Sequence, residues 1–211
     1  MITQTEASAK KVDYKTALQM LKDGNKRFVA NLRANRNLAD QVKETGANGQ
    51  YPFATVLHCV DSRVSAELLF DQGVGDLFSA RVAGNFVNTD ILGSMEFASL
   101  ASHSKVIVVL GHTKCGAIAG ACAGTRAAAN LDQLLITLEK EAVSRVDRKD
   151  YDEEKDKYAY INAVAEENVR VTIANILERS PALAAANSGD DKFIDIVGGM
   201  YHVEDGHIEW L

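Results

Sequence analysis

The chain has 211 residues, which is enough for one domain with a sizeable hydrophobic core. Its 23 Lys and Arg residues against 29 Asp and Glu residues give a formal net charge of −6, so no basic excess favours binding to nucleic acid or to anionic lipid. No apolar run approaches the roughly 20 residues that span a bilayer, and the first residues lack the basic and apolar regions of a signal peptide. We expect a single domain over 1–211, cytoplasmic unless a leader to the periplasm or an organelle has been removed, with neither nucleic acid nor membrane as a partner.

The first fifty residues or so predict an N-terminal helical arm. Asp13 can cap a helix that extends to about Leu32 and carries one apolar stripe. The stripe consists of Leu18, Leu21, Phe28 and Leu32. The polar stretch from Asn35 to Gln50 is interpreted as an arm or loop. Because this stretch separates the helix from the rest of the chain, we expect a neighbouring subunit to cover the stripe.

Residues 51–211 predict an α/β core. Four short apolar runs have the profile of buried parallel strands: Ala54–Cys59, Leu77–Val82, Lys105–Gly111 and Phe193–Val197. Helices are predicted at Thr89–Ser102, Gly116–Ala123 and Asn130–Ser144, and in a long segment that ends near Arg179. Asp205-Gly206, between Tyr201–Val203 and His207–Trp210, is a strong hairpin signal. The alternation predicts a mostly parallel central sheet of four strands plus a C-terminal hairpin strand, flanked by helices.

Two short strings at predicted strand ends carry candidate chemistry. They are Cys59-Val60-Asp61-Ser62-Arg63 and His112-Thr113-Lys114-Cys115. Residues beyond the carboxyl ends of parallel strands converge at one edge of a sheet, where ligands bind. Two Cys and one His are ligands that zinc prefers, and three protein ligands leave one position open, as catalytic zinc sites do. With the carboxylate of Asp61 and the guanidinium of Arg63 alongside, the sequence predicts a catalytic zinc site.

The two strings, together with two further segments, resemble the β-class carbonic anhydrases. The matching segments are Cys59–Val64, Asp76–Phe78, Arg81–Asn85 and Gly111–Gly116, and the likeness extends from about Leu18 to Trp210. The resemblance implies Zn²⁺ held by Cys59, His112 and Cys115, with water or, in a closed site, Asp61 in the fourth position. It implies a zinc lyase that reversibly hydrates carbon dioxide to bicarbonate and a proton, by attack of a zinc-bound hydroxide that Asp61 and Arg63 orient. It also implies a homodimer or a dimer of dimers, with the active-site cleft near the subunit interface.

Two other functions stay open. Relatives of this family hydrolyse carbonyl sulfide or carbon disulfide with the same fold and metal, and the sequence does not show the access tunnel that would separate these substrates. A zinc-binding protein without catalytic activity is a third hypothesis, since Asp61 and Arg63 could form an ordinary surface ion pair.

The remaining Cys and His residues are interpreted as structural. Cys122 follows Cys115 by seven positions and is expected to be a small core residue. His58 alternates with Cys59 along the strand and should point to the opposite face as a packing residue. His103, His202 and His207 lie near the ends of elements or in the hairpin and are expected at the surface.

Overall fold

The computed structural model describes residues 3–211. Its strands are β1 (Ala54–His58), β2 (Leu77–Arg81), β3 (Val106–His112), β4 (Asp195–Tyr201) and β5 (Ile208–Trp210). Its helices are α1 (Glu6–Ala9), α2 (Tyr14–Val29), α3 (Leu38–Asn48), α4 (Ala66–Leu69), α5 (Thr89–Glu96), α6 (Gly116–Cys122), α7 (Ala129–Glu141), α8 (Ala159–Arg179) and α9 (Pro181–Ala186). A π-helical turn, Phe97–Ala101, continues α5, and 3-10 turns occupy Val143–Arg145 and Arg148–Asp150. Over the described residues, no helix combines the length and the apolar character that a membrane crossing needs.

The strands form one sheet in the order β2-β1-β3-β4-β5. The first four strands are parallel to their neighbours, and β5 is antiparallel to β4. This confirms the predicted architecture of four parallel strands and a C-terminal hairpin strand. The order places β1 and β3 side by side at the centre, so the residues that follow these two strands meet at the same edge of the sheet.

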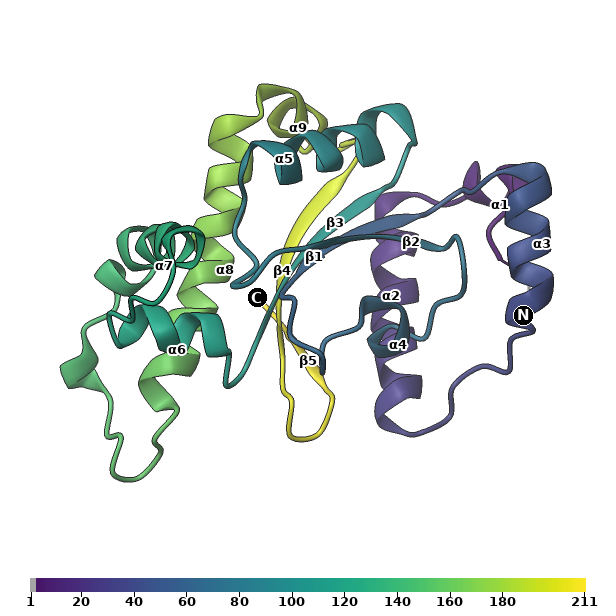
Figure 1. Cartoon of the computed structure of the whole chain (residues 1–211). Coiled ribbons are helices and arrows are strands. Elements are labelled where there is room, and N and C mark those ends of the chain that lie inside the picture. The colour runs from purple at the N-terminus through teal and green to yellow at the C-terminus, as the bar shows by residue number, and fades with distance from the viewer. Residues whose placement is uncertain (1–2) are drawn as a thin grey trace.

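Helices cover both faces of the sheet (Figure 1). Along β3, Ile107 and Val109 belong to the hydrophobic cluster on the side of α7 and α8, whereas Val106, Val108 and Leu110 belong to the cluster on the side of α2 and α4. All of these side chains are fully buried. A strand that is buried on both faces reads as a continuous apolar run, which is why β3 was the clearest strand in the sequence.

The helix α2 packs against the sheet of its own chain, so a neighbouring subunit is not needed to cover most of its stripe. Ala17 and Leu21 are fully buried in the same cluster as Val108 and Leu110. Only the end of the predicted stripe is exposed to solvent. The helix ends at Val29, and Leu32 beyond it is 71% exposed. The expectation that a partner covers α2 is therefore wrong for the buried part of the helix.

The polar stretch after α2 contains a helix that its composition concealed. Asn37 caps α3 by accepting a hydrogen bond from the backbone N–H of Asp40. The interpretation of this stretch as an arm or loop is wrong. The helix was not recognised because α3 lies at the surface and its sequence has almost no apolar periodicity. Gln41 is its buried residue, and Leu38 and Val42 are both more than half exposed.

The strand β4 lies further along the chain than predicted. The expected apolar run, Phe193–Val197, stops at Gly198, whereas the observed strand continues to Tyr201. A Cβ atom at Gly198 would come within 2.8 Å of a methyl group of Val169 on α8. The glycine therefore allows the close approach of α8 to the sheet. The same glycine interrupts the apolar run, so the second half of the strand was not predicted.

An ion-pair cluster around Asp71 joins α2 to the loop after α4. The Asp71 carboxylate is 3% exposed and accepts hydrogen bonds from Arg27 Nε (2.5 Å), from the Arg36 guanidinium and from the backbone N–H of Ala34. Burial acts to raise the pKa of Asp71, but these donors outweigh it and the pKa is lowered. Asp71→Asn should lower the free energy of unfolding by about 3 kcal/mol at neutral pH, measured by urea denaturation. The exposed control Asp23→Asn should change it by less than about 0.5 kcal/mol.

The same pair of variants gives a test by pH. Because the folded-state pKa of Asp71 lies below the unfolded value of about 3.9, its contribution is complete above that value and is lost as the pH falls through the folded pKa. The difference between wild type and Asp71→Asn should therefore be constant above about pH 5 and shrink in stronger acid. A difference that was already small at pH 7 would contradict the proposed role of the cluster.

Candidate metal centre

The two strings identified in the sequence lie together at the carboxyl edge of the sheet. Cys59 follows the last residue of β1, and His112 is the last residue of β3, with Cys115 three positions beyond it. Since β1 and β3 pair in parallel, with His58 opposite Leu110, their ends bring the strings into one place. Cys115 also stands at the N-cap of α6, which fixes the direction of its backbone.

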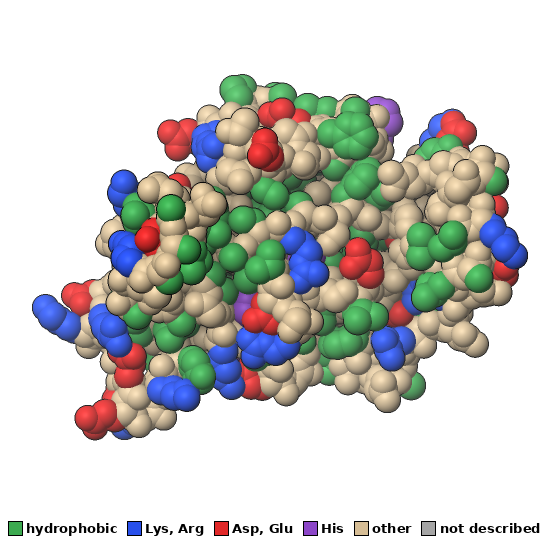
Figure 2. Space-filling model, in the orientation of Figure 1, with side chains coloured by type: hydrophobic (Ala, Val, Ile, Leu, Met, Phe, Trp, Pro, Cys, Tyr) green, Lys and Arg blue, Asp and Glu red, His purple; other side chains and the backbone are tan. Residues whose placement is uncertain are grey.

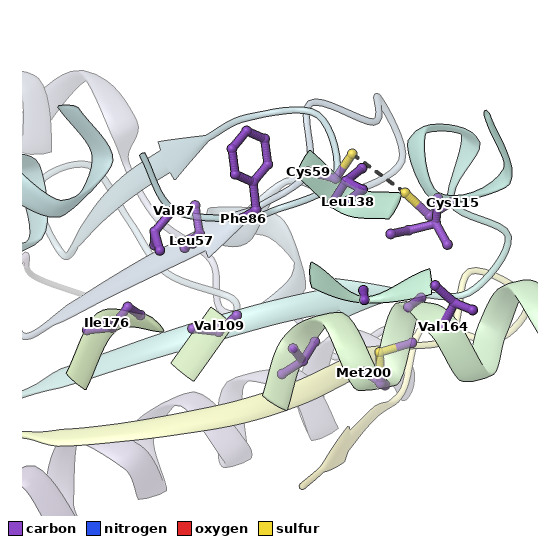
Figure 3. Packing of buried hydrophobic residues seen from close by; sticks show 14 of the residues in the cluster. Leu57, Cys59, Phe86, Val87, Val109, Cys115, Leu138, Val164, Ile176 and Met200 are labelled. Carbon is purple, nitrogen blue, oxygen red and sulfur yellow. Dashed lines mark hydrogen bonds between the residues drawn. The ribbon is translucent and has the colours of Figure 1, made fainter. Parts of the chain in front are cut away.

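The side chains of Cys59, His112 and Cys115 converge on one point. One ligand atom from each lies within 4.8 Å of the others. The two sulfur atoms face one another at 4.0 Å, as the dashed line in Figure 3 shows. All three residues are at most 3% exposed. Such a buried cluster of two sulfurs and one imidazole nitrogen is a set of ligands that suits a tetrahedral zinc ion with one position left over.

The orientation of His112 supports metal binding by its Nε2 atom. Nδ1 donates a hydrogen bond to the carbonyl oxygen of Thr113 at 2.9 Å, so the neutral ring carries its lone pair on Nε2. Nε2 is buried and has no hydrogen-bond partner among the described residues. A buried nitrogen without a partner is costly in a folded protein, and a metal ion would satisfy it. The residues present therefore fit a zinc ion.

The two thiols influence each other's ionisation. The neighbouring side chains of Cys115 and His112 and the backbone N–H of Gly84 lower the pKa of Cys59 against the opposing effect of burial. The pKa of Cys115 is raised, chiefly by its proximity to Cys59 and by burial. Two buried sulfurs this close do not both ionise readily on their own, and a divalent cation between them offsets that repulsion.

Asp61 is held by Arg63 beside the three ligand atoms. Arg63 donates to Asp61 Oδ1 from its backbone N–H and from Nε, both at 2.9 Å, and to Oδ2 from Nη2 at 2.8 Å. These hydrogen bonds lower the pKa of Asp61 to about 2, so the carboxylate is ionised at neutral pH. Its Oδ2 atom lies 4.0 Å from His112 Nε2. The carboxylate thus borders the metal site while its two oxygens face a guanidinium.

Several residues outside the two strings support the site through contacts that the sequence did not reveal. Arg81, at the end of β2, donates to the carbonyl oxygens of Cys59 (3.3 Å) and Asp61 (2.9 Å) and so fixes the loop between them. Asn168 of α8 is buried and donates to the carbonyl of Gly84 at 2.8 Å, and the Gly84 N–H lies 3.4 Å from the Cys59 sulfur. Each contact joins residues that are at least 20 positions apart, and no local pattern reveals such pairs.

In the segment Arg81–Asn85, which resembles the family, the structure explains why position 84 is a glycine. Its φ of +78° is in the left-handed region that favours glycine. A Cβ atom there would also meet Leu138 at 2.6 Å. A side chain at this position would displace the backbone N–H that faces Cys59, so the glycine keeps the contact between this N–H and the Cys59 sulfur in place.

A second set of contacts anchors the segment after β3. Thr113 donates to Glu204 at 2.9 Å, and Lys114 pairs with Glu204 at 2.7 Å. Lys114 has a left-handed backbone (φ 54°), and its N–H donates to the side chain of Asn162 at 2.8 Å. The turn after β4 and the start of α8 therefore hold the peptide between His112 and Cys115 in a fixed conformation.

The other Cys and His residues lie outside the metal cluster. His58 is fully buried, and its ring contacts the Cys59 carbonyl and the hydroxyl of Ser79, which confirms the packing role. Cys122 is half-buried on α6, and burial raises the pKa of its thiol to about 11. His103 and His207 are exposed, as predicted, whereas His202 is half-buried.

Known proteins share this arrangement of sequence and fold. A family model described as carbonic anhydrase matches residues 54–208. Carbonic anhydrase 2 of Mycobacterium tuberculosis is 35% identical to the chain over 190 residues, covering 90% of the chain and 89% of the relative. The carbonic anhydrase of Mycolicibacterium smegmatis is 35% identical over 193 residues, covering 92% and 91%. A crystal structure from a study of two tetrameric β-carbonic anhydrases of Sordaria macrospora is similar with a TM-score of 0.70 and 27% identity, over 82% of this chain and 88% of that one.

Proposed function

Because the chain belongs to the β-class carbonic anhydrase family and is a carbonic anhydrase, we propose that it hydrates carbon dioxide reversibly at a zinc ion held by Cys59, His112 and Cys115. The observation that carries this proposal is the convergence of three buried ligand atoms, of which His112 Nε2 has no other partner among the described residues. Zinc in such a site acts as a Lewis acid that lowers the pKa of water from about 15.7 towards 7.

Asp61 is proposed to orient the reacting water. Its carboxylate is ionised, borders the ligand cluster and is 17% exposed, so it can accept a hydrogen bond from a water molecule beside the metal. An accepted hydrogen bond fixes the direction of the remaining lone pairs on the water oxygen, one of which then faces the carbon of CO₂.

Arg63 is proposed to position Asp61. Two guanidinium hydrogen bonds, one to each carboxylate oxygen, hold the carboxylate in one plane and keep it charged. Arg63 also donates to the carbonyl of Lys114 at 3.3 Å, which ties the pair to the loop that carries Cys115. Without Arg63, the Asp61 carboxylate would be free to approach the metal as a fourth ligand and close the site.

A substrate comparison tests this function against hydrolysis of the sulfur analogues. The purified zinc enzyme should turn over CO₂ with a kcat/KM far above that for carbonyl sulfide or carbon disulfide, measured by stopped flow with a pH indicator and by release of hydrogen sulfide. Faster turnover of either sulfur compound would assign the same site to the alternative hydrolase reaction. An absence of turnover on all three substrates would leave the protein as a zinc-binding protein.

We also propose that the protein assembles as a homodimer or as a dimer of dimers. Hydrophobic side chains reach the visible surface in patches between the charged ones (Figure 2). The edge strand β2 carries one such patch, in which Phe78 packs edge-on against Phe97, and Phe97 is 58% exposed. An unpaired edge strand beside exposed aromatic rings favours association with another copy.

Light scattering at micromolar concentration should give at least twice the chain mass of 22.9 kDa. Phe97→Asp should shift the mass towards the monomer, because it introduces a charge into the patch beside β2. Leu131→Asp is the matched control, since Leu131 is also exposed (40%) but lies on α7. A monomeric wild type would contradict the proposed assembly.

A further inference from the structure

A cavity lies at the amino edge of the sheet, where the loops that lead into the strands meet. Its volume is about 860 Å³. It is lined by the segments 51–53 before β1, 102–105 before β3 and 190–193 before β4, and by parts of α1 and the start of α2. Cavities of this size hold small-molecule ligands in other proteins. The length of β3, roughly 20 Å, separates it from the metal site at the carboxyl edge.

Aromatic side chains give the cavity an apolar surface. They are Tyr14 at the start of α2, Tyr51 and Phe53 before β1, and Phe193 before β4. Phe53 is buried, whereas Phe193 is 40% exposed although it is large and apolar. Rings of this kind pack favourably against the face or the edge of another ring. The cavity therefore suits a ligand with an aromatic part.

Lys105 supplies a partly buried positive charge to the cavity. It directly precedes the central strand β3, and its backbone is fixed on both sides: its N–H donates to the Phe53 carbonyl at 2.9 Å, and its carbonyl accepts from the Asp195 N–H at 3.0 Å. The ammonium Nζ lies 3.5 Å from the centroid of the Phe193 ring. Burial lowers the pKa of Lys105, and no acidic side chain among residues 3–211 opposes that effect. A bound anion would supply the missing partner.

The other charged groups around the cavity are either paired or exposed to solvent. Lys10 pairs with Glu6 at 2.7 Å, and Lys192 pairs with Asp195. The remaining ones are exposed: Asp13, Lys15, Asp190 and Asp191. Exposed charges are solvated and screened by salt, so they do not need a ligand as Lys105 does. Three of these four are carboxylates, which disfavour a ligand with several negative charges.

We propose that this cavity binds a small aromatic monoanion, whose carboxylate pairs with Lys105 and whose ring packs against Phe193 and Tyr14. One unpaired inner cation matches one negative charge, and the aromatic lining matches the body of such a ligand. The acidic rim selects against nucleotides and other polyanions by repulsion. This binding is separate from the proposed hydration of CO₂ and needs no zinc.

The test uses benzoate as the probe, titrated into the zinc-loaded protein and followed by NMR of the imidazole C–H signals. His103 packs edge-on against Phe193 with ring centroids 6.0 Å apart, so its signal reports on the cavity. A spectrum of His103→Gln assigns that signal. Benzoate should shift it saturably, with a Kd of about 1 mM or below. Benzyl alcohol, which lacks the charge, should bind more weakly by about tenfold or more.

Substitutions of Lys105 test the charge directly. Lys105→Met should weaken benzoate binding by about tenfold or more, whereas Lys105→Arg keeps the charge and should stay near the wild-type affinity. Lys22→Met is the matched control, because Lys22 also lies over an aromatic ring, 5.4 Å from the Trp210 centroid, but does not line the cavity. All three variants should hydrate CO₂ at the wild-type rate, and circular dichroism should show that they are folded.

Benzoate is also an anion that a zinc ion can attract, and the readouts separate the two sites. Inhibition of CO₂ hydration by benzoate without a saturable shift of the His103 signal would place the probe at the metal and overturn the proposal. A shift that Lys105→Met leaves unchanged would overturn it too, as would equal affinity for benzyl alcohol. Phenyl phosphate, a dianion, should bind more weakly than benzoate, and tighter binding would contradict the selection by the acidic rim.

Discussion

Asp61→Asn should retain its zinc and lose about 100-fold in kcat/KM for CO₂ hydration. The amide has nearly the same shape as the carboxylate, but one of its two ends is a hydrogen-bond donor and it carries no charge. It therefore loses the charge-assisted bonds from Arg63 at 2.8 and 2.9 Å and accepts a weaker hydrogen bond from the reacting water. Stopped-flow hydration together with metal analysis on the same preparation measures both quantities.

The control for this variant is Asp23→Asn, the same chemical change on the exposed surface of α2, where Asp23 accepts hydrogen bonds from Gln19 and Lys26 of the same helix. It should keep wild-type kinetics. An Asp61→Asn enzyme that hydrated CO₂ at the wild-type rate would show that Asp61 and Arg63 are an ordinary surface pair. An Asp61→Asn enzyme that lost its zinc would instead make Asp61 a metal ligand in the active state.

Cys115→Ser should lose its zinc and, with it, the activity. A serine hydroxyl is a poor zinc ligand at neutral pH, and only Cys59 and His112 would remain from the protein. Metal analysis after dialysis should fall from about one zinc per chain in wild type to nearly none. Because Cys115 is 1% exposed and occupies the N-cap position of α6, circular dichroism should be recorded to show that the variant is folded.

Cys122→Ser is the matched control, since it makes the same substitution seven residues away on α6. The Cys122 thiol is half-buried and belongs to no ligand cluster among the described residues. Cys122→Ser should keep its zinc and its activity. Zinc retained by Cys115→Ser at the wild-type level would exclude the proposed ligand set.

The sequence predicted the elements whose buried residues form a simple pattern. The strand β3 is buried on both faces, and its uninterrupted apolar run indicated a buried strand. The convergence of Cys59 with His112 followed from the same logic, because each stands at the carboxyl end of a parallel strand. A rule about sheet topology therefore located the candidate site without any contact being known.

The sequence could not predict features that depend on contacts between distant segments. The helix α3 gives no apolar stripe because Leu38 and Val42 face solvent, so its polar composition resembled a loop. The burial of α2 under its own sheet depends on where the chain after it travels, and no periodicity encodes that. Asn168 and Gly84 meet across 84 positions through one side-chain hydrogen bond. Single polar residues of this kind carry no pattern, although they hold the backbone around Cys59.

The most direct test of the proposed function is stopped-flow hydration of CO₂ by the same preparation in three states: as purified, after removal of zinc with a chelator, and after zinc is added back. The enzyme as purified should contain about one zinc per chain and hydrate CO₂ rapidly. Removal should abolish the catalysed rate, and addition of zinc should restore it. Full activity in a preparation that metal analysis shows to be free of zinc would contradict a zinc site at Cys59, His112 and Cys115.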